Sequence, residues 1–310
     1  MLRPFHRLTP PGLLVLVAVL LLASCGPRAA SRVDDRFSGG YPMFRDEASG
    51  ITAILGTPDL AVGTFRVAVS FSDRNGLIRA PSIEWQLYRT GQSGDAAQVA
   101  AAQFFAFPDG ARGLYTAPLD FTAAGRWTLT ATVPRTDGQP VAVTLPLEVA
   151  ARASAPVVGA AAPASRNRVA ADVPSLGHLT TSPTPEPALY QHRIAESLAA
   201  HRPLVVVFAS PAFCTTPLCG PQVEEAAELA KTYGDRADFV HVDLYQNPQD
   251  IKGDLSGAAR SPLLKEWGLR TDQWTFVIDA NGTIAARFEA FVPRAELQAA
   301  LRRALEVPRR

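Results

Sequence analysis

The hydrophobic pattern of this 310-residue chain changes its period across one stretch rich in Ala, Pro and Ser, residues 151–187. Before this stretch, apolar and polar side chains alternate, as in GRWTLTATV, where Trp127, Leu129, Ala131 and Val133 share one face. A period of two is typical of half-buried antiparallel strands. After the stretch, amphipathic helical patterns alternate with apolar runs such as PLVVVFAS, which indicates a mixed α/β unit. The sequence therefore predicts two domains, which is usual for this length.

The first domain, residues 50–150, reads as six or seven short strands separated by turn signals such as Asn75-Gly76. This spacing predicts an all-β sandwich of immunoglobulin or fibronectin-III type. The phrase GLYTAPLDFTAAGRWTLTATV resembles a strand pair of small Ig-like envelope domains. No Cys lies between Gly26 and Phe213, so the inter-sheet disulfide of antibody domains is absent. With no cluster of titratable residues here, we expect a structural or interaction role for this domain.

The stretch 151–187 contains no aromatic residue and is interrupted by Pro throughout. Such a composition buries too little apolar surface to offset the entropy of ordering the chain. We therefore expect an extended, partly disordered Pro/Ala-rich linker, on which the two domains move independently.

The first 24 residues have the pattern of a secretory signal. Arg3 and Arg7 precede the apolar run GLLVLVAVLLLA, which is too short for a spanning helix, although an uncleaved anchor is the alternative. The motif Leu22-Ala23-Ser24-Cys25 resembles the bacterial lipobox. The resemblance implies that Cys25 is lipidated, that residues 25–49 form an N-terminal tether, and that the protein is anchored at the extracytoplasmic face of the cell membrane. Disulfides persist in that compartment.

The charge pattern argues against nucleic acid as a partner. The formal net charge is +1, and no clustered basic footprint of the kind that binds nucleic acid occurs in the chain. We expect protein partners in the cell envelope, besides the membrane itself.

The second domain, residues 188–310, is predicted to contain elements in the order α-β-α-β-α-β-β-α, with the first strands parallel and the last pair an antiparallel hairpin. Cys214 and Cys219 follow the first of these strands, in the stretch FASPAFCTTPLCGP. Apart from Cys25 they are the only cysteines in the chain.

This order of elements, the position of the Cys pair and the phrase TFVIDANGTIAARFE resemble the thioredoxin superfamily over about Tyr190 to Val307. The resemblance implies a thioredoxin-like fold with the redox cysteine at the start of a helix, where N–H groups and the helix dipole stabilise the reactive thiolate. Four residues separate the two cysteines here, in place of the usual two. Either Cys214 holds the first position, or Cys219 does and Gln222 replaces the second Cys.

Three readings of the Cys pair follow. The first is a thiol-disulfide oxidoreductase that exchanges with protein thiols or disulfides through Cys214 and Cys219, without a cofactor or resident metal; His241 and Trp274 are auxiliary candidates. The second is a non-catalytic binding lipoprotein with a structural disulfide. It is favoured because two features of the thioredoxin family are missing: the cis-proline before the hairpin strand, where Gln273 and Trp274 stand, and the buried carboxylate in the strand before the cysteines, which reads LVVVFA. The third is a thiol peroxidase, since CTTPLC also resembles a peroxiredoxin subgroup.

Single positions weigh against the peroxidase reading and against metal binding, which is a fourth possibility. A peroxidase would need a Thr or Ser three residues before Cys214, where Pro211 stands, with Ser210 one residue further away; Arg270 lies several residues from the place of the expected Arg. Two thiolates together with His241 would suit copper(I) or zinc, but a strand histidine is more often packed in the core.

Overall fold

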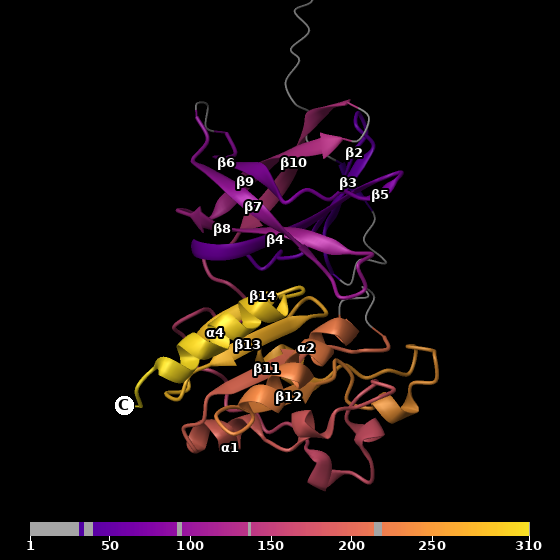
Figure 1. The fold of residues 1–310 in the computed structure, drawn as a ribbon, viewed down its shortest axis with the longest axis vertical. Helices are drawn as coiled ribbons and strands as arrows, with labels where there is room; N and C mark the ends of the chain where they lie inside the picture. Colours follow the sequence, from indigo (N-terminus) through magenta and orange to yellow (C-terminus); the bar gives the residue numbers. More distant parts are fainter. Residues whose placement is uncertain (1–30, 34–39, 92–94, 136–137, 214–218, 310) are drawn as a thin grey trace, which may run out of the picture.

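The computed structural model describes residues 31–33, 40–91, 95–135, 138–213 and 219–309. It contains two sheets joined by a long connecting segment (Figure 1). Figure 1 shows the larger sheet above the smaller one, with β14 on the side that faces it.

The larger sheet has ten strands and forms the β unit. Neighbours along the path β1-β2-β3-β4-β8-β7-β6-β9-β10 pair antiparallel, and β5 pairs with β4. The strands are β1 (Ser31–Val33), β2 (Met43–Asp46), β3 (Ile51–Leu55), β4 (Gly63–Asp73), β5 (Gly76–Leu77), β6 (Ser82–Arg89), β7 (Gln98–Ala106), β8 (Gly113–Phe121), β9 (Gly125–Arg135) and β10 (Gly138–Val149).

The all-β character predicted from the period of two is present, but the pairing differs from two separate sheets. Because β4 pairs with β8 and β6 with β9, the hydrogen-bonded ladder runs through one continuous sheet around one core. Trp85 and Trp127 are buried in this core, and Trp127 Nε1 donates to the carbonyl of Ala123 at 2.9 Å. The sheet also begins earlier than predicted, since β1 and β2 fall within residues 25–49.

The smaller sheet has four strands in the order β12-β11-β13-β14. β11 pairs parallel with β12, and β13 pairs antiparallel with β14, as predicted for the first strands and the last pair. β11 also pairs antiparallel with β13. Helices α2 and α4 pack on one face, and α1 and α3 on the other. The elements are α1 (Ile194–Ala199), β11 (Leu204–Phe208), α2 (Cys219–Tyr233), β12 (Asp238–Val242), α3 (Pro262–Glu266), β13 (Trp274–Ile278), β14 (Ile284–Glu289) and α4 (Arg294–Glu306).

The connecting segment, residues 151–187, packs on the smaller sheet and its helices, and the prediction of an extended, partly disordered tether is wrong. It contains the short 3-10 helices η1 (Ala170–Asp172) and η2 (Leu176–His178), while η3 (Pro187–Tyr190) closes it. Buried Asn167 accepts from the N–H of Ile194 at 2.8 Å and donates to the carbonyl of His192 at 3.0 Å. A composition rich in polar residues suggests disorder, but here a polar side chain makes hydrogen bonds to backbone groups of the C-terminal unit.

The β unit also touches the C-terminal unit directly. Arg66 of β4 pairs with Glu296 of α4 at 2.8 Å, and the rings of Phe107 and Phe291 lie 4.6 Å apart in a shared apolar cluster. Arg287 of β14 pairs with Asp59 at 2.9 Å. These contacts oppose the predicted independent motion of the two units.

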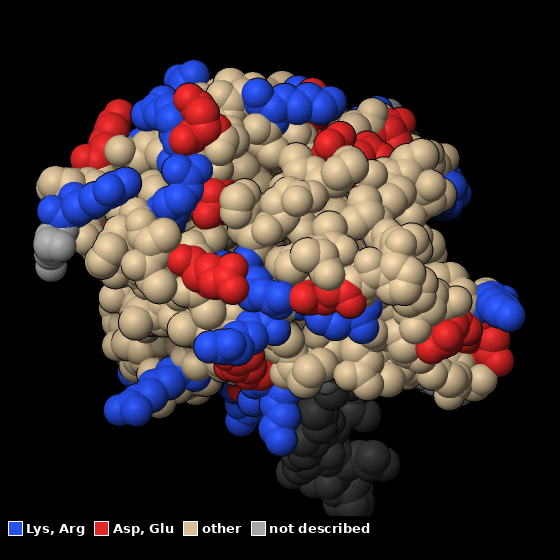
Figure 2. All heavy atoms as spheres, turned by 90° about the horizontal axis from the view of Figure 1, so that it is seen from below, with Lys and Arg blue, Asp and Glu red and all other residues tan. Residues whose placement is uncertain are grey.

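Among the described residues, no helix is long and apolar enough to cross a membrane. On the face seen in Figure 2, basic and acidic side chains lie interspersed, without one large patch of a single sign.

Candidate functional site

Cys219 lies at the corner between the central strand β11 and helix α2. It is the first described residue of α2, it is completely buried, and it is disulfide-bonded. Cys214 lies outside the described residues, as does Cys25, so the pairing of Cys214 with Cys219 and the lipidation of Cys25 remain predictions.

The loop that leads into β13 approaches this corner. The Sγ atom of Cys219 lies 3.6 Å from the carbonyl oxygen of Asp272. When the disulfide is reduced, the S–H group of Cys219 can donate to this carbonyl. A hydrogen bond to the neutral form favours the thiol over the thiolate, so the carbonyl opposes the effect of the helix start on Cys219.

Two buried glutamines join this loop to α2. Gln273 Nε2 donates to Gln222 Oε1 at 2.9 Å and to the carbonyl of Ala290 at 3.2 Å. The same Gln222 oxygen accepts from the N–H of Val292 at 2.8 Å. Gln222, which sequence reasoning placed where a second Cys can stand, is thus a structural link. The role of Gln273 was missed, because one residue preceding a strand gives no signal of its contacts.

His241 does not present a free nitrogen to a metal. Nε2 lies 3.0 Å from the carbonyl of Ala209, which can only accept, so Nε2 carries the proton. Nδ1 therefore accepts from the hydroxyl of Tyr190 at 2.8 Å. Burial lowers the pKa of His241, while the nearby carboxyl of Asp243 acts in the opposite direction. The ring is a packed, neutral histidine, as strand histidines commonly are.

Trp274 lies in the apolar core on the opposite face of the sheet from Cys219. It stacks on Phe276 at 5.7 Å between centroids, and the guanidinium carbon of Arg287 lies 4.8 Å from its ring centroid. The described contacts of Trp274 are therefore with the core and the neighbouring strand, not with Cys219.

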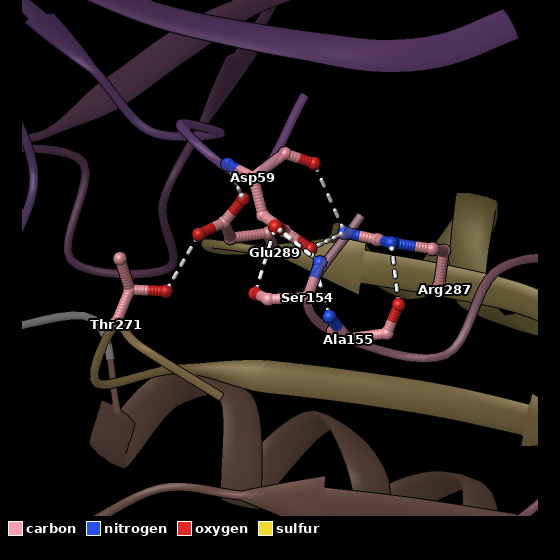
Figure 3. Close-up of polar contacts among 6 residues, drawn as sticks. All are labelled: Asp59, Ser154, Ala155, Thr271, Arg287 and Glu289. Carbon is pink, nitrogen blue, oxygen red and sulfur yellow. Dashed lines mark hydrogen bonds and ion pairs between the residues drawn. The ribbon is translucent and has the colours of Figure 1, made fainter. Parts of the chain in front are cut away.

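Glu289, at the end of β14, is a buried carboxyl that sequence reasoning missed. Oε1 accepts from the hydroxyl of Thr271 at 2.6 Å, and Oε2 from the N–H of Asp59 at 3.0 Å (Figure 3). Burial raises the pKa of Glu289 to about 8, and the nearby charge of Asp59 adds to this shift. The only sequence signal was an acidic residue at the end of an apolar strand.

Asp59 is anchored at the start of the connecting segment. Its carboxyl accepts from the N–H groups of Ser154 and Ala155 at 2.9 and 3.1 Å, and from Arg287 at 2.9 Å (Figure 3). Burial by itself would raise the pKa of Asp59, but these hydrogen bonds and the Arg287 charge outweigh burial, and the pKa is lowered.

The described residues offer little support for metal binding or for a thiol peroxidase. No group of three or more His, Cys, Asp or Glu residues among them is placed to hold a metal ion. Arg270 is exposed, and buried Ser210 exchanges a hydrogen bond with Thr181 at 2.9 Å. Neither residue is shown aimed at Cys219.

No family model matches the sequence, and no curated protein does. Solved structures match over about a third of the chain. A thiol:disulfide interchange protein of the thioredoxin family from Chlorobium tepidum TLS matches with 19% identity and a TM-score of 0.29, over 36% of this chain and 84% of that one. The exposed lipoprotein thioredoxin Etrx1 from Streptococcus pneumoniae strain TIGR4 matches with 19% identity and a TM-score of 0.27, over 34% and 89%.

Proposed function

We propose that this chain is a lipid-anchored extracytoplasmic protein whose thioredoxin-like C-terminal unit exchanges thiols and disulfides with proteins of the cell envelope. The observation that carries the proposal is Cys219, a disulfide-bonded cysteine at the first described residue of α2, the helix that follows the inner strand β11. A cysteine there has helix N–H groups on one side and, in this chain, the carbonyl of Asp272 on the other.

Anchoring and compartment rest on the sequence. The apolar run 12–23, whose end overlaps the motif Leu22-Ala23-Ser24-Cys25, supports lipidation of Cys25 outside the cytoplasm, where a disulfide is maintained. We assign to the β unit an interaction or positioning role, because its described core is apolar and its described strands carry no buried titratable cluster of their own.

We assign the first attack to Cys214, because Cys219 is completely buried and closed to a protein substrate. In the reducing direction, the Cys214 thiolate attacks a substrate disulfide, forms a mixed disulfide and releases one substrate thiolate, which takes up a proton. Cys219 then loses its proton and attacks the Cys214 sulfur. The second substrate thiol leaves and the Cys214–Cys219 disulfide remains. The reverse sequence oxidises a substrate dithiol.

A second candidate is a binding lipoprotein in which the disulfide only fixes the loop before α2. The complete burial of Cys219 and the presence of Gln273, bonded to Gln222 and Ala290 where the thioredoxin family has a proline, favour it. In that case the surfaces of the two units, and not the sulfur atoms, carry the function.

The reduction potential of the disulfide separates the two candidates. We would equilibrate the full-length chain, in mild detergent, with glutathione buffers and count free thiols by alkylation. A potential between about −120 and −270 mV is the range of exchange catalysts, and a value below about −300 mV belongs to structural disulfides.

Trapping gives the second readout. The Cys219→Ser variant should accumulate mixed disulfides with envelope proteins, because no thiol remains to resolve them. Cys214→Ser is the matched control and should trap none. Equal trapping by both variants would contradict the assigned order of attack.

A further inference from the structure

The loop Arg270–Gln273, which faces Cys219, is contacted from the β unit. Gly40 lies against it in a left-handed conformation, with φ of +84°, and a Cβ atom at this position would come within 3.1 Å of the Arg270 carbonyl oxygen. Tyr41 is buried in the apolar cluster that the β unit shares with Ala290 and Phe291. Residues between β1 and β2 thus lie against the loop.

Glu289 connects the same loop to a second segment of the β unit. One carboxyl oxygen accepts from Thr271 in the loop and the other from the N–H of Asp59 (Figure 3). Asp59 is itself fixed by Ser154, Ala155 and Arg287. A chain of short contacts therefore runs from the β unit through Glu289 to Thr271, the neighbour of Asp272.

Ala290 brings a third contact to the loop. Its backbone is left-handed, with φ of +60°, which is costly for a residue other than glycine. Ala290 N–H donates to the carbonyl of Gln273, and its carbonyl accepts from the Gln273 side chain. On its other side, a Cβ atom at Gly56 of the β unit would come within 3.1 Å of the Ala290 Cβ. The strained residue is thus enclosed between the loop and the β unit.

We propose that the β unit, through Asp59, Glu289 and Thr271, positions the Asp272 carbonyl at Cys219 and so adjusts how readily the disulfide is reduced. The inference rests on the proposed exchange function and adds a role for the β unit in it. Thr271 and Glu289 are positioning residues, since neither touches the sulfur; they act through the backbone of Asp272.

The direction of the effect follows from the contact. The Asp272 carbonyl accepts a hydrogen bond only from the reduced Cys219, because a disulfide sulfur carries no proton. Holding the carbonyl in place stabilises the reduced state, and releasing it favours the disulfide. One net hydrogen bond corresponds to about a twofold to tenfold change in the equilibrium constant between thiols and disulfide.

The test compares reduction potentials of full-length variants in dithiothreitol buffers, which also reduce structural disulfides. Thr271→Val removes the hydroxyl that Glu289 accepts from, and should shift the equilibrium about twofold to tenfold toward the disulfide. Tenfold equals about 30 mV. Thr271→Ser keeps the hydroxyl and should restore the wild-type value. Gly40→Ala places a methyl group of the β unit close to the Arg270 carbonyl oxygen in the loop, and should also change the reduction potential.

Thr64→Val is the matched control, because Thr64 makes its hydroxyl contact with Asp120 inside the β unit. It should leave the potential unchanged. If Thr271→Val has the wild-type potential, the inference is wrong; if Thr271→Val shifts it and Gly40→Ala does not, the loop matters but the β unit does not. Failure of the proposed function is read separately, from a wild-type potential below about −300 mV.

Discussion

Glu289 illustrates how a single buried side chain can connect two units and carry a pH dependence. The residue is 4% exposed, and its carboxyl faces Thr271, the N–H of Asp59, and the charges of Asp59 and Arg287. A raised pKa means that the folded state prefers the protonated carboxyl, while the unfolded chain ionises near pH 4.5.

We expect Glu289 to make the folded state less stable as the pH rises from about 4.5 to about 8. In this window the folded protein binds more protons than the unfolded chain, so the free energy of unfolding falls by up to about 1.4 kcal/mol for each pH unit. Below the window both states are protonated and the contribution is complete. Glu289→Gln, which imitates the protonated form, should flatten the profile, and urea unfolding at several pH values measures it.

The difference between the two profiles isolates Glu289 from other titrating groups. Burial also raises the pKa of Asp243, but that group is present in both proteins and cancels. Burial raises the pKa of Tyr41 well above 10, outside the window. Parallel profiles for wild type and Glu289→Gln between pH 5 and 8 would show that Glu289 does not titrate as described.

At the scale of elements, the hydrophobic periodicity of the sequence predicted where strands lie. It did not predict the packing of the connecting segment, which depends on the hydrogen bonds of single polar residues. The period of two located the strands around Trp127, and the apolar run Leu204–Phe208 became the fully buried β11. The connecting segment was misjudged because its stability comes from residues such as Asn167 and Ser165, which bond to distant groups. Composition averages over such residues, so it cannot reveal that they are buried and bonded.

The candidate site also has a part that the sequence predicted and a part that it did not. The order of elements predicted Cys219 at a strand-to-helix corner, and Cys219 is the first described residue of α2. The contacts of Gln273, Glu289 and Ala290 join positions far apart in the chain, and no local pattern marks them. His241 was a candidate because of its residue type, and its two hydrogen bonds instead place it among packed core groups.

We expect the connecting segment to contribute to the stability of the C-terminal unit through Asn167. Its side chain bonds to the backbone at the start of α1, so Asn167→Ala leaves the buried N–H of Ile194 and the half-buried carbonyl of His192 without this partner. The expected loss is about 1 to 3 kcal/mol in the free energy of unfolding. Gln191→Ala is the control, because Gln191 is exposed and bonds only locally, to Pro187; its effect should stay within about 0.5 kcal/mol. Equal effects of the two substitutions would support the tether predicted from composition.

On the scale of the whole molecule, the two units are joined by ion pairs, by an apolar cluster and by the packed connecting segment. Gly268 shows how close the packing is, since a Cβ atom there would lie 2.0 Å from the Ser154 carbonyl oxygen. A C-terminal unit fixed in this way presents the corner at Cys219 in one orientation relative to the β unit. That orientation is what the proposed role of the β unit requires.

The Asp59–Arg287 pair should be the strongest electrostatic link between the units. The two side chains are 10% and 9% exposed, so solvent screens them little. Removing one partner alone, by Asp59→Ala or Arg287→Met, leaves a buried charge unpaired and should cost about 3 to 5 kcal/mol. In a double-mutant cycle we expect a coupling energy of about 1.5 kcal/mol or more, measured by urea unfolding.

The exposed pair Arg45–Glu47 supplies the matched control within the β unit. Its side chains are 48% and 72% exposed and lie 3.6 Å apart, so Arg45→Met and Glu47→Ala should couple by less than about 0.5 kcal/mol. If the Asp59–Arg287 cycle gives a value as small as this control, the ion pair does not hold the units together. The apolar cluster around Phe107 and Phe291 would then be the main link.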